Sequence, residues 1–190
     1  MFESIGLWWR FHGRYYHKDF YRGIVNLIKW TPIIWKDRDW DSSYIFKILE
    51  HKLKLQSKGI ADRDIHVNAK RDSEIMLICV KLMEKLREDY YQMEYTDYHE
   101  SKYWFEDIED RPGYSSWESE IKSENFDDYF KKYPLIYKRV LNGEGVFNID
   151  SDNESYKKQK IAMNIGHINH DRARALLFKL MNENIERWWD

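Results

Sequence analysis

Apolar side chains recur three and four residues apart in four stretches of the chain, which is the spacing of an amphipathic α-helix. The stretches run from about His17 to Trp30, from Tyr44 to Leu53, from about Ala69 to Tyr91 and from about Tyr156 to Trp188. The third is the most regular, with one stripe that holds Ile75, Ile78, Cys79, Leu82, Met83, Leu86 and Tyr90. The pattern predicts an all-α fold, a helical bundle of three to four main helices.

Helix-breaking and capping residues place the expected ends of these helices. Pro32 disfavours the α region for the residue before it, so the first helix should stop there. In the second stretch Tyr44, Ile45, Ile48, Leu49 and Leu53 form the expected buried face, and Glu50 is expected on the opposite side. In the last stretch Gly166 suggests a break, with a local restart at Asn169 or Asp171.

The segment 94–153 differs from the rest because it is acidic, aromatic and irregular in pattern. Arg111, Pro112 and Gly113 predict a turn, short helices are expected near Trp117 to Tyr133, and residues 146–149 suggest a short strand. A chain of 190 residues is the size of one domain. We therefore expect a single helical domain over 1–190, with 94–153 as an insertion.

Composition narrows the class of protein. The chain has nine Trp, fourteen Tyr and nine Phe, and such rings serve cores, interfaces and stacking surfaces alike. The one cysteine, Cys79, excludes an internal disulfide and is expected to be an inert buried thiol. No apolar run approaches the ~18 residues needed to cross a bilayer, so no membrane partner is expected and the protein is placed in a reducing cytoplasm.

Charge is distributed unevenly along the chain. Residues 1–58 hold eleven Lys or Arg against six Asp or Glu, whereas residues 94–128 hold three against twelve. The first region suits phosphates and the second suits a basic partner, although the two regions can also face one another in a fold or oligomer. The formal net charge of −2 argues against binding to nucleic acid, which requires a basic face.

Two short clusters, each just before a helix, alternate carboxylates with an arginine. An arginine can hold a phosphate bidentately while a neighbouring ring stacks on a base, which predicts a ligand-binding site. Basic groups also alternate with rings near the N-terminus. The candidate ligand-binding residues are Trp35, Lys36, Arg38, Trp40, Arg63, His66, Arg10 and Arg14. The alternatives are that the clusters cap helices and pair among themselves, and that the N-terminal rings anchor an arm.

Motifs for catalysis are missing from the sequence. There is no Walker loop, no GxGxxG and no GxSxG, so no catalytic residue and no cofactor is predicted. His167 and His170 stand three residues apart next to Asp171, a geometry that is similar to part of a metal site. Further ligands are not identifiable and the same residues suit a helix start, so no metal site is assigned.

Two segments give a resemblance to a known group of proteins. They are NLIKWTPIIWKDRDWD, residues 26–41, and ARALLFKLMNENIERWWD, residues 173–190. With these segments the chain resembles a group of small proteins of tailed bacteriophages. The resemblance implies a phage protein that acts in the host cytoplasm.

By analogy with compact helical phage proteins, the resemblance implies a counter-defence factor. The leading hypothesis is a homo-oligomeric sponge that sequesters a nucleotide immune signal of the host, a cyclic nucleotide or an ADP-ribose derivative, without catalysis. The alternative is a protein-interaction factor that inhibits a host protein or assists virion assembly through its acidic, aromatic surface between Tyr95 and Tyr133.

Overall fold

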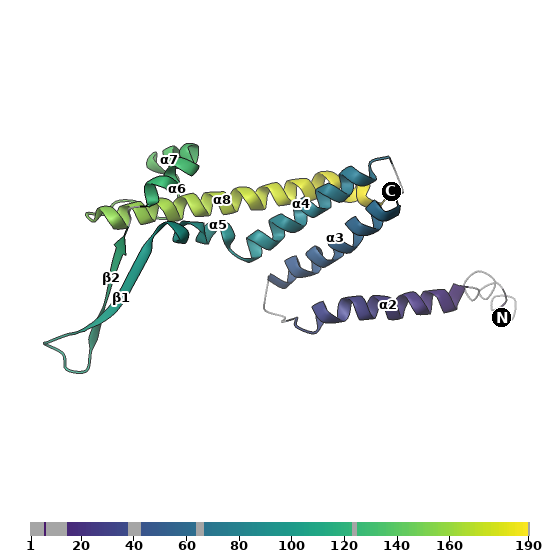
Figure 1. Cartoon of the computed structure of the whole chain (residues 1–190), viewed down its shortest axis with the longest axis horizontal. Helices are drawn as coiled ribbons and strands as arrows, with labels where there is room; N and C mark the ends of the chain where they lie inside the picture. The colour runs from purple at the N-terminus through teal and green to yellow at the C-terminus, as the bar shows by residue number, and fades with distance from the viewer. Residues whose placement is uncertain (1–5, 7–14, 38–42, 64–66, 123–124, 190) are drawn as a thin grey trace. The chain divides into compact units, whose positions relative to one another are not determined.

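A computed structural model describes residues 6, 15–37, 43–63, 67–122 and 125–189 of the chain. The described chain is largely helical, as the sequence predicted (Figure 1). Its long helices are α2 (Tyr16–Ile34), α3 (Ser43–Arg63), α4 (Ala69–Arg87) and α8 (Glu154–Asn184). The shorter helical elements are α5 (Tyr90–Met93), η2 (Glu94–Tyr98), α6 (Phe126–Lys132), α7 (Pro134–Leu141) and η3 (Ile185–Trp189).

The chain divides into two compact units, Met1–Lys52 and Leu53–Asp190. In the first unit α2 contacts the start of α3, where the Tyr44 hydroxyl donates to the Ile33 carbonyl over 3.1 Å. The Trp30 indole also meets the His51 ring edge to face, with centroids 4.8 Å apart. The expectation of one domain with an insertion at 94–153 stays a prediction.

Helix α8 organises the second unit, since α4, α5, α6 and α7 all pack against it. Asn153 begins the helix by accepting hydrogen bonds from the backbone N–H groups of Ser155 and Tyr156. Gly166 lets α5 come close, because a Cβ there would lie 2.9 Å from the Tyr91 carbonyl oxygen. The expected restart near Asn169 is wrong, because α8 runs without a break through Gly166.

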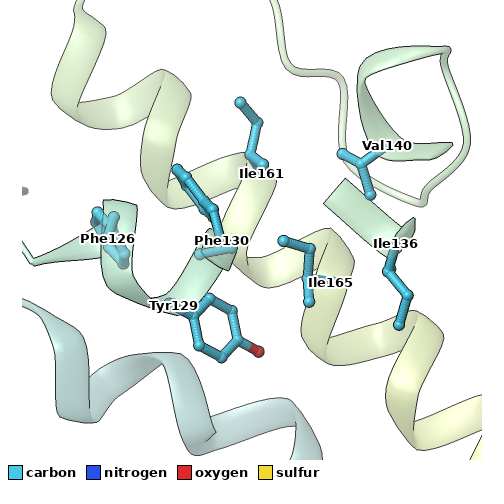
Figure 2. Packing of buried hydrophobic residues seen from close by; sticks show 8 residues of the cluster. Phe126, Tyr129, Phe130, Ile136, Val140, Ile161 and Ile165 are labelled. Atoms are coloured by element: carbon cyan, nitrogen blue, oxygen red, sulfur yellow. The ribbon is translucent and has the colours of Figure 1, made fainter. Parts of the chain in front are cut away.

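One hydrophobic cluster lies where α6 and α7 cross α8. It contains Phe126, Tyr129, Phe130, Ile136, Val140, Ile161, Ala162 and Ile165, all buried. Figure 2 shows the rings of α6 and the aliphatic side chains of α7 meeting Ile161 and Ile165 of α8. Their spacing along each helix is the three and four residue spacing of a buried stripe. This cluster holds α6 and α7 on α8.

The predicted stop at Pro32 is wrong. Helix α2 continues to Ile34, and the Trp35 N–H still donates to the Thr31 carbonyl over 2.9 Å. Pro32 stands in the last turn, so only one intrahelical hydrogen bond lacks its donor. The Thr31 hydroxyl adds a bond to the Leu27 carbonyl at 2.6 Å, which supports the helical backbone just before the proline.

The buried faces of α3 and α4 are rotated from the predicted stripes. On α3, Tyr44 and Leu53 are buried as expected, but Ile45 is exposed and Glu50 is buried. On α4, Cys79, Met83 and Leu86 are buried as expected, whereas Ile78 is exposed and Met76 takes its place. The buried face of α4 also includes Asp72 and Ser73. The Ser73 hydroxyl lies 2.8 Å from that of Ser57, a polar contact that a count of apolar residues does not reveal.

The segment 94–153 contains a β-hairpin, so the fold is largely helical and not all-α. Strands β1 (Glu100–Asp107) and β2 (Ser115–Lys122) form a two-stranded antiparallel sheet. The predicted turn at Arg111–Gly113 lies between them, with the Tyr114 N–H donating to the Arg111 carbonyl over 3.0 Å. Short helices near Trp117 to Tyr133 are confirmed only from Phe126 onward, since Trp117 lies on β2. The short strand expected at 146–149 is wrong, because these residues form a loop.

Candidate functional site

The structure describes three of the predicted ligand-binding residues. Trp35 and Lys36 follow the end of α2, both are exposed, and Trp35 keeps 83% of its surface accessible. They line a shallow groove of about 470 Å³ together with Ile28, Thr31 and Pro32. Arg63 is exposed in the last turn of α3, in the second unit.

The other predicted ligand-binding residues lie outside the described residues. These are Arg10, Arg14, Arg38, Trp40 and His66. The structure thus brings Trp35 and Lys36 together at one groove. A shared pocket that also holds the arginines stays a prediction.

The histidine pair of α8 has contacts of its own. His167 Nδ1 lies 3.4 Å from Gln92 Nε2, and its ring packs on Phe147 with centroids 5.2 Å apart. Burial lowers the pKa of His170 below its usual range. Among the described residues no group of three or more His, Cys, Asp or Glu side chains is arranged to hold a metal ion.

A buried carboxylate, Glu94, joins η2 to the end of α6 and to Tyr133, the residue between α6 and α7. Its Oε1 accepts from Lys132 Nζ over 2.5 Å, and its Oε2 accepts from the Tyr133 hydroxyl over 2.7 Å. The bond to Glu94 raises the pKa of Lys132, and burial together with the same carboxylate raises that of Tyr133. Both groups therefore keep their protons at neutral pH. The arrangement suits a structural lock and does not prepare a group for proton transfer.

A loop after α7 wraps around the buried side chain of Asn164. The Asn164 Oδ1 accepts from the backbone N–H groups of Val146 and Phe147, each over 2.9 Å, and Nδ2 donates to the Phe147 carbonyl over 2.8 Å. Gly145 passes so close that a Cβ there would lie 2.5 Å from Asn164. The loop leaves a cavity of about 170 Å³, but the amide groups of Asn164 are already bonded to the loop. We interpret this feature as a clamp for the loop.

Cys79 is buried on α4, as the sequence predicted, and its burial raises the pKa of the thiol to about 11. The thiolate is the reactive form, so this cysteine is not suited to nucleophilic chemistry at neutral pH. None of the helices that the structure describes is both long and apolar enough to cross a membrane.

The hairpin, residues 100–122, is the strongest candidate site, and we call it the arm. Its base is attached to α8, because the Ser119 and Tyr156 hydroxyls lie 2.8 Å apart and Ile121 packs on the hydrophobic cluster. Beyond the base, β1 and β2 extend away from α8 (Figure 1). Most residues of β1 are exposed, including its large side chains.

The strand register gives the arm two different faces. Phe105 pairs with Trp117, and Tyr103 lies two residues away on the same side of β1. These three rings form the aromatic face, with exposed fractions of 57% for Tyr103, 75% for Phe105 and 64% for Trp117. The Tyr103 and Trp117 rings are stacked, with centroids 5.3 Å apart. The opposite face, which we call the acidic face, holds Trp104, Glu106, Glu118 and Glu120 together with Glu100, Lys102 and Lys122.

The sequence contained a signal for this hairpin. On the β2 side of Arg111–Gly113, Trp117 and Ile121 stand an even number of residues apart between polar side chains, which fits one face of a strand that follows a turn. The signal is weak because the apolar residues of β1 are consecutive, from Tyr103 to Phe105. A run of three rings with charged neighbours fits an irregular segment equally well.

Comparison with protein-family models, with curated proteins and with solved structures found no match for this chain. The resemblance to phage proteins therefore stays a prediction.

Proposed function

We propose that this protein is a protein-interaction factor that binds its partner with the arm, as the alternative hypothesis from the sequence holds. In a phage, such a factor would inhibit a host protein or assist virion assembly. The observation that carries the proposal is the aromatic face, where Tyr103, Phe105 and Trp117 are exposed on an element whose base is fixed to α8. Clustered exposed rings are typical of protein contacts, and Tyr and Trp often supply most of the binding energy.

The geometry of the arm suits this role in two further ways. The stacking of Tyr103 on Trp117 holds both rings in place before binding, which reduces the side-chain conformational entropy that is lost on binding. A two-stranded hairpin is marginally stable alone in water, so additional contacts along its length would stabilise it. We retain the predicted helical bundle as the body that carries the arm.

The test is a comparison of matched variants of the full-length protein. The triple variant Tyr103→Ser, Phe105→Ser, Trp117→Ser removes the aromatic face, and Phe178→Ser removes an exposed ring on α8 as a control. Partners from host extract are identified by mass spectrometry, purified and tested for direct binding. The proposal expects binding by the parent protein and by the control, and its loss in the triple variant. Unchanged binding by a correctly folded triple variant would contradict it.

A second candidate is the nucleotide sponge, and the groove beside Trp35 and Lys36 favours it. An exposed indole suits a base and the neighbouring ammonium suits a phosphate. The test measures the thermal stability of the protein in the presence of cyclic dinucleotides, cyclic trinucleotides and ADP-ribose derivatives. A ligand at ~100 times its dissociation constant stabilises the fold by about 2.7 kcal/mol.

Recovery of unchanged ligand and loss of the shift in Trp35→Ala would support the sponge. The predicted homo-oligomer is tested on the same samples by light scattering. The absence of a shift with every nucleotide would leave the arm as the functional element.

A further inference from the structure

The acidic face of the arm has a geometry of its own around Trp104. The Trp104 Nε1 donates to Glu106 Oε1 over 2.8 Å, which fixes the orientation of the indole. Across the strands Trp104 pairs with Glu118, so a second glutamate lies next to Trp104 on the same face of the sheet. The indole keeps 40% of its surface exposed. An exposed indole with two glutamates beside it is attractive to a cationic side chain, both through the ring quadrupole and through charge.

The carboxylates next to Trp104 are not neutralised by the arm itself. Toward the base, the register sets Lys102 opposite Glu120 and Lys122 opposite Glu100. Toward the tip, Glu106 pairs with Ser116, and neither Glu106 nor Glu118 has an ion pair among the described residues. Residues 100–122 carry seven Asp or Glu and three Lys or Arg. The arm is therefore acidic, and Glu106 and Glu118 beside Trp104 contribute to its excess negative charge, as do the acidic residues toward the tip.

The negative charge of the arm distinguishes between the kinds of molecule that could bind to it. A second arm would bring carboxylates against carboxylates, which costs binding free energy. Nucleic acid and anionic lipid would be repelled for the same reason. A basic protein segment fits this surface in two ways. Its cations match the carboxylates, and its backbone can pair with a free strand edge. Both β1 and β2 are edge strands in the two-stranded sheet that the structure describes.

We propose that the acidic face binds an extended, Lys- or Arg-bearing segment of a partner protein, with a cationic side chain on the Trp104 indole between Glu106 and Glu118. This inference rests on the proposed function, in which the arm is the docking element. The aromatic face supplies apolar contact area, and the acidic face selects the charge of the partner. The two roles belong to different residues on opposite sides of the sheet, so they can be separated by mutation.

The experiment uses the full-length protein and two labelled synthetic peptides of ten residues, one alternating Arg with Val and one alternating Glu with Val. Binding is measured by fluorescence anisotropy at low and at high salt. We expect the Arg peptide to bind and the Glu peptide not to bind. Glu106→Gln with Glu118→Gln should weaken Arg-peptide binding about tenfold. Trp104→Leu should weaken it about threefold.

The control variant combines Glu74→Gln with Glu186→Gln, two exposed glutamates outside the arm, and changes the net charge by the same amount. We expect it to bind the Arg peptide like the parent protein at high salt. Equal binding of both peptides, or equal weakening by the control and the Glu106 and Glu118 variant, would overturn the inference. Circular dichroism and thermal unfolding confirm that each variant is folded.

Failure of this inference and failure of the proposed function give different results. If the aromatic-face variant loses its identified partner while Glu106→Gln with Glu118→Gln keeps it, the arm is the docking element but does not select a cationic segment. If the aromatic-face variant keeps the partner, the proposed function itself fails.

Discussion

The same kinds of aromatic side chain have opposite roles in two neighbouring regions of the second unit. In α6, Phe126, Tyr129 and Phe130 are buried against α8, whereas Phe105 and Trp117 of the arm are exposed. The difference arises from the surface on which each element packs. Helices α6 and α7 cross the long helix α8, whereas the distal part of the arm crosses no element that the structure describes. Aromatic side chains are therefore buried in one region and exposed in the other, and only the packing separates the two cases.

The largest expected difference between the regions is in stability. Phe126 is fully buried between the His99 and Phe130 rings, so Phe126→Ala should lower the free energy of unfolding by about 4 kcal/mol. Phe105→Ala in the arm should lower it by less than about 0.5 kcal/mol. Urea denaturation of the two variants checks the prediction. Comparable losses would mean that the arm is packed as tightly as the cluster.

The loop clamp extends the packed region, and its loss should have the next largest effect. Asn164→Ala leaves two backbone N–H groups and one carbonyl without their partner, which should cost about 3 kcal/mol. The control is Asn182→Ala, an exposed position on the same helix. The denaturation midpoint should fall only for Asn164→Ala, and similar midpoints for both would contradict the clamp.

Two glycines sharpen the contrast between a close approach and an open helix surface. Gly166→Ala brings a Cβ to 2.9 Å from the Tyr91 carbonyl oxygen, and we expect a loss of about 2 kcal/mol. Gly59→Ala meets nothing within 4 Å on α3 and should stabilise the protein by about 0.5 kcal/mol, since alanine has the higher helix propensity. Melting temperatures that shift in opposite directions would confirm the prediction. Shifts in the same direction would contradict the close packing of α5 on α8.

The smallest expected effect is the titration of Tyr129, Tyr133 and Lys132 at high pH. Burial raises the pKa of Tyr129 and Tyr133, and the bond to Glu94 raises that of Lys132, so the folded protein favours the protonated forms. The resulting stability is complete below the ordinary tyrosine pKa of about 10 and is lost as the pH rises above it. Unfolding midpoints between pH 8 and pH 11 measure this loss.

The variant Tyr133→Phe should remove part of the pH dependence and cost about 1 kcal/mol at neutral pH, because one acceptor bond of Glu94 is lost. A pH profile identical to that of the parent protein would show that this phenol does not contribute.

Helical spacing was sufficient to predict the long helices, because the period of a helix is written in the order of its apolar residues. The same spacing was not sufficient to predict which face is buried, since the face of α4 includes Asp72 and Ser73, whose burial depends on a neighbouring helix. A proline predicts the end of a helix, but Pro32 stands in the last turn of α2, where it removes only one hydrogen bond. For the candidate site, the sequence indicated the acidic, aromatic segment but not its strands.

By itself, then, the sequence determined the helical class, the buried thiol of Cys79, the turn at Arg111–Gly113 and the uneven charge. The tertiary structure decided which rings are covered and which are presented, the register that separates an aromatic face from an acidic face, and the close contact at Gly166. The physical reason is that helix period, turn chemistry and charge are local properties of the chain. Burial and strand register depend on residues that are distant in sequence and meet only in the folded protein.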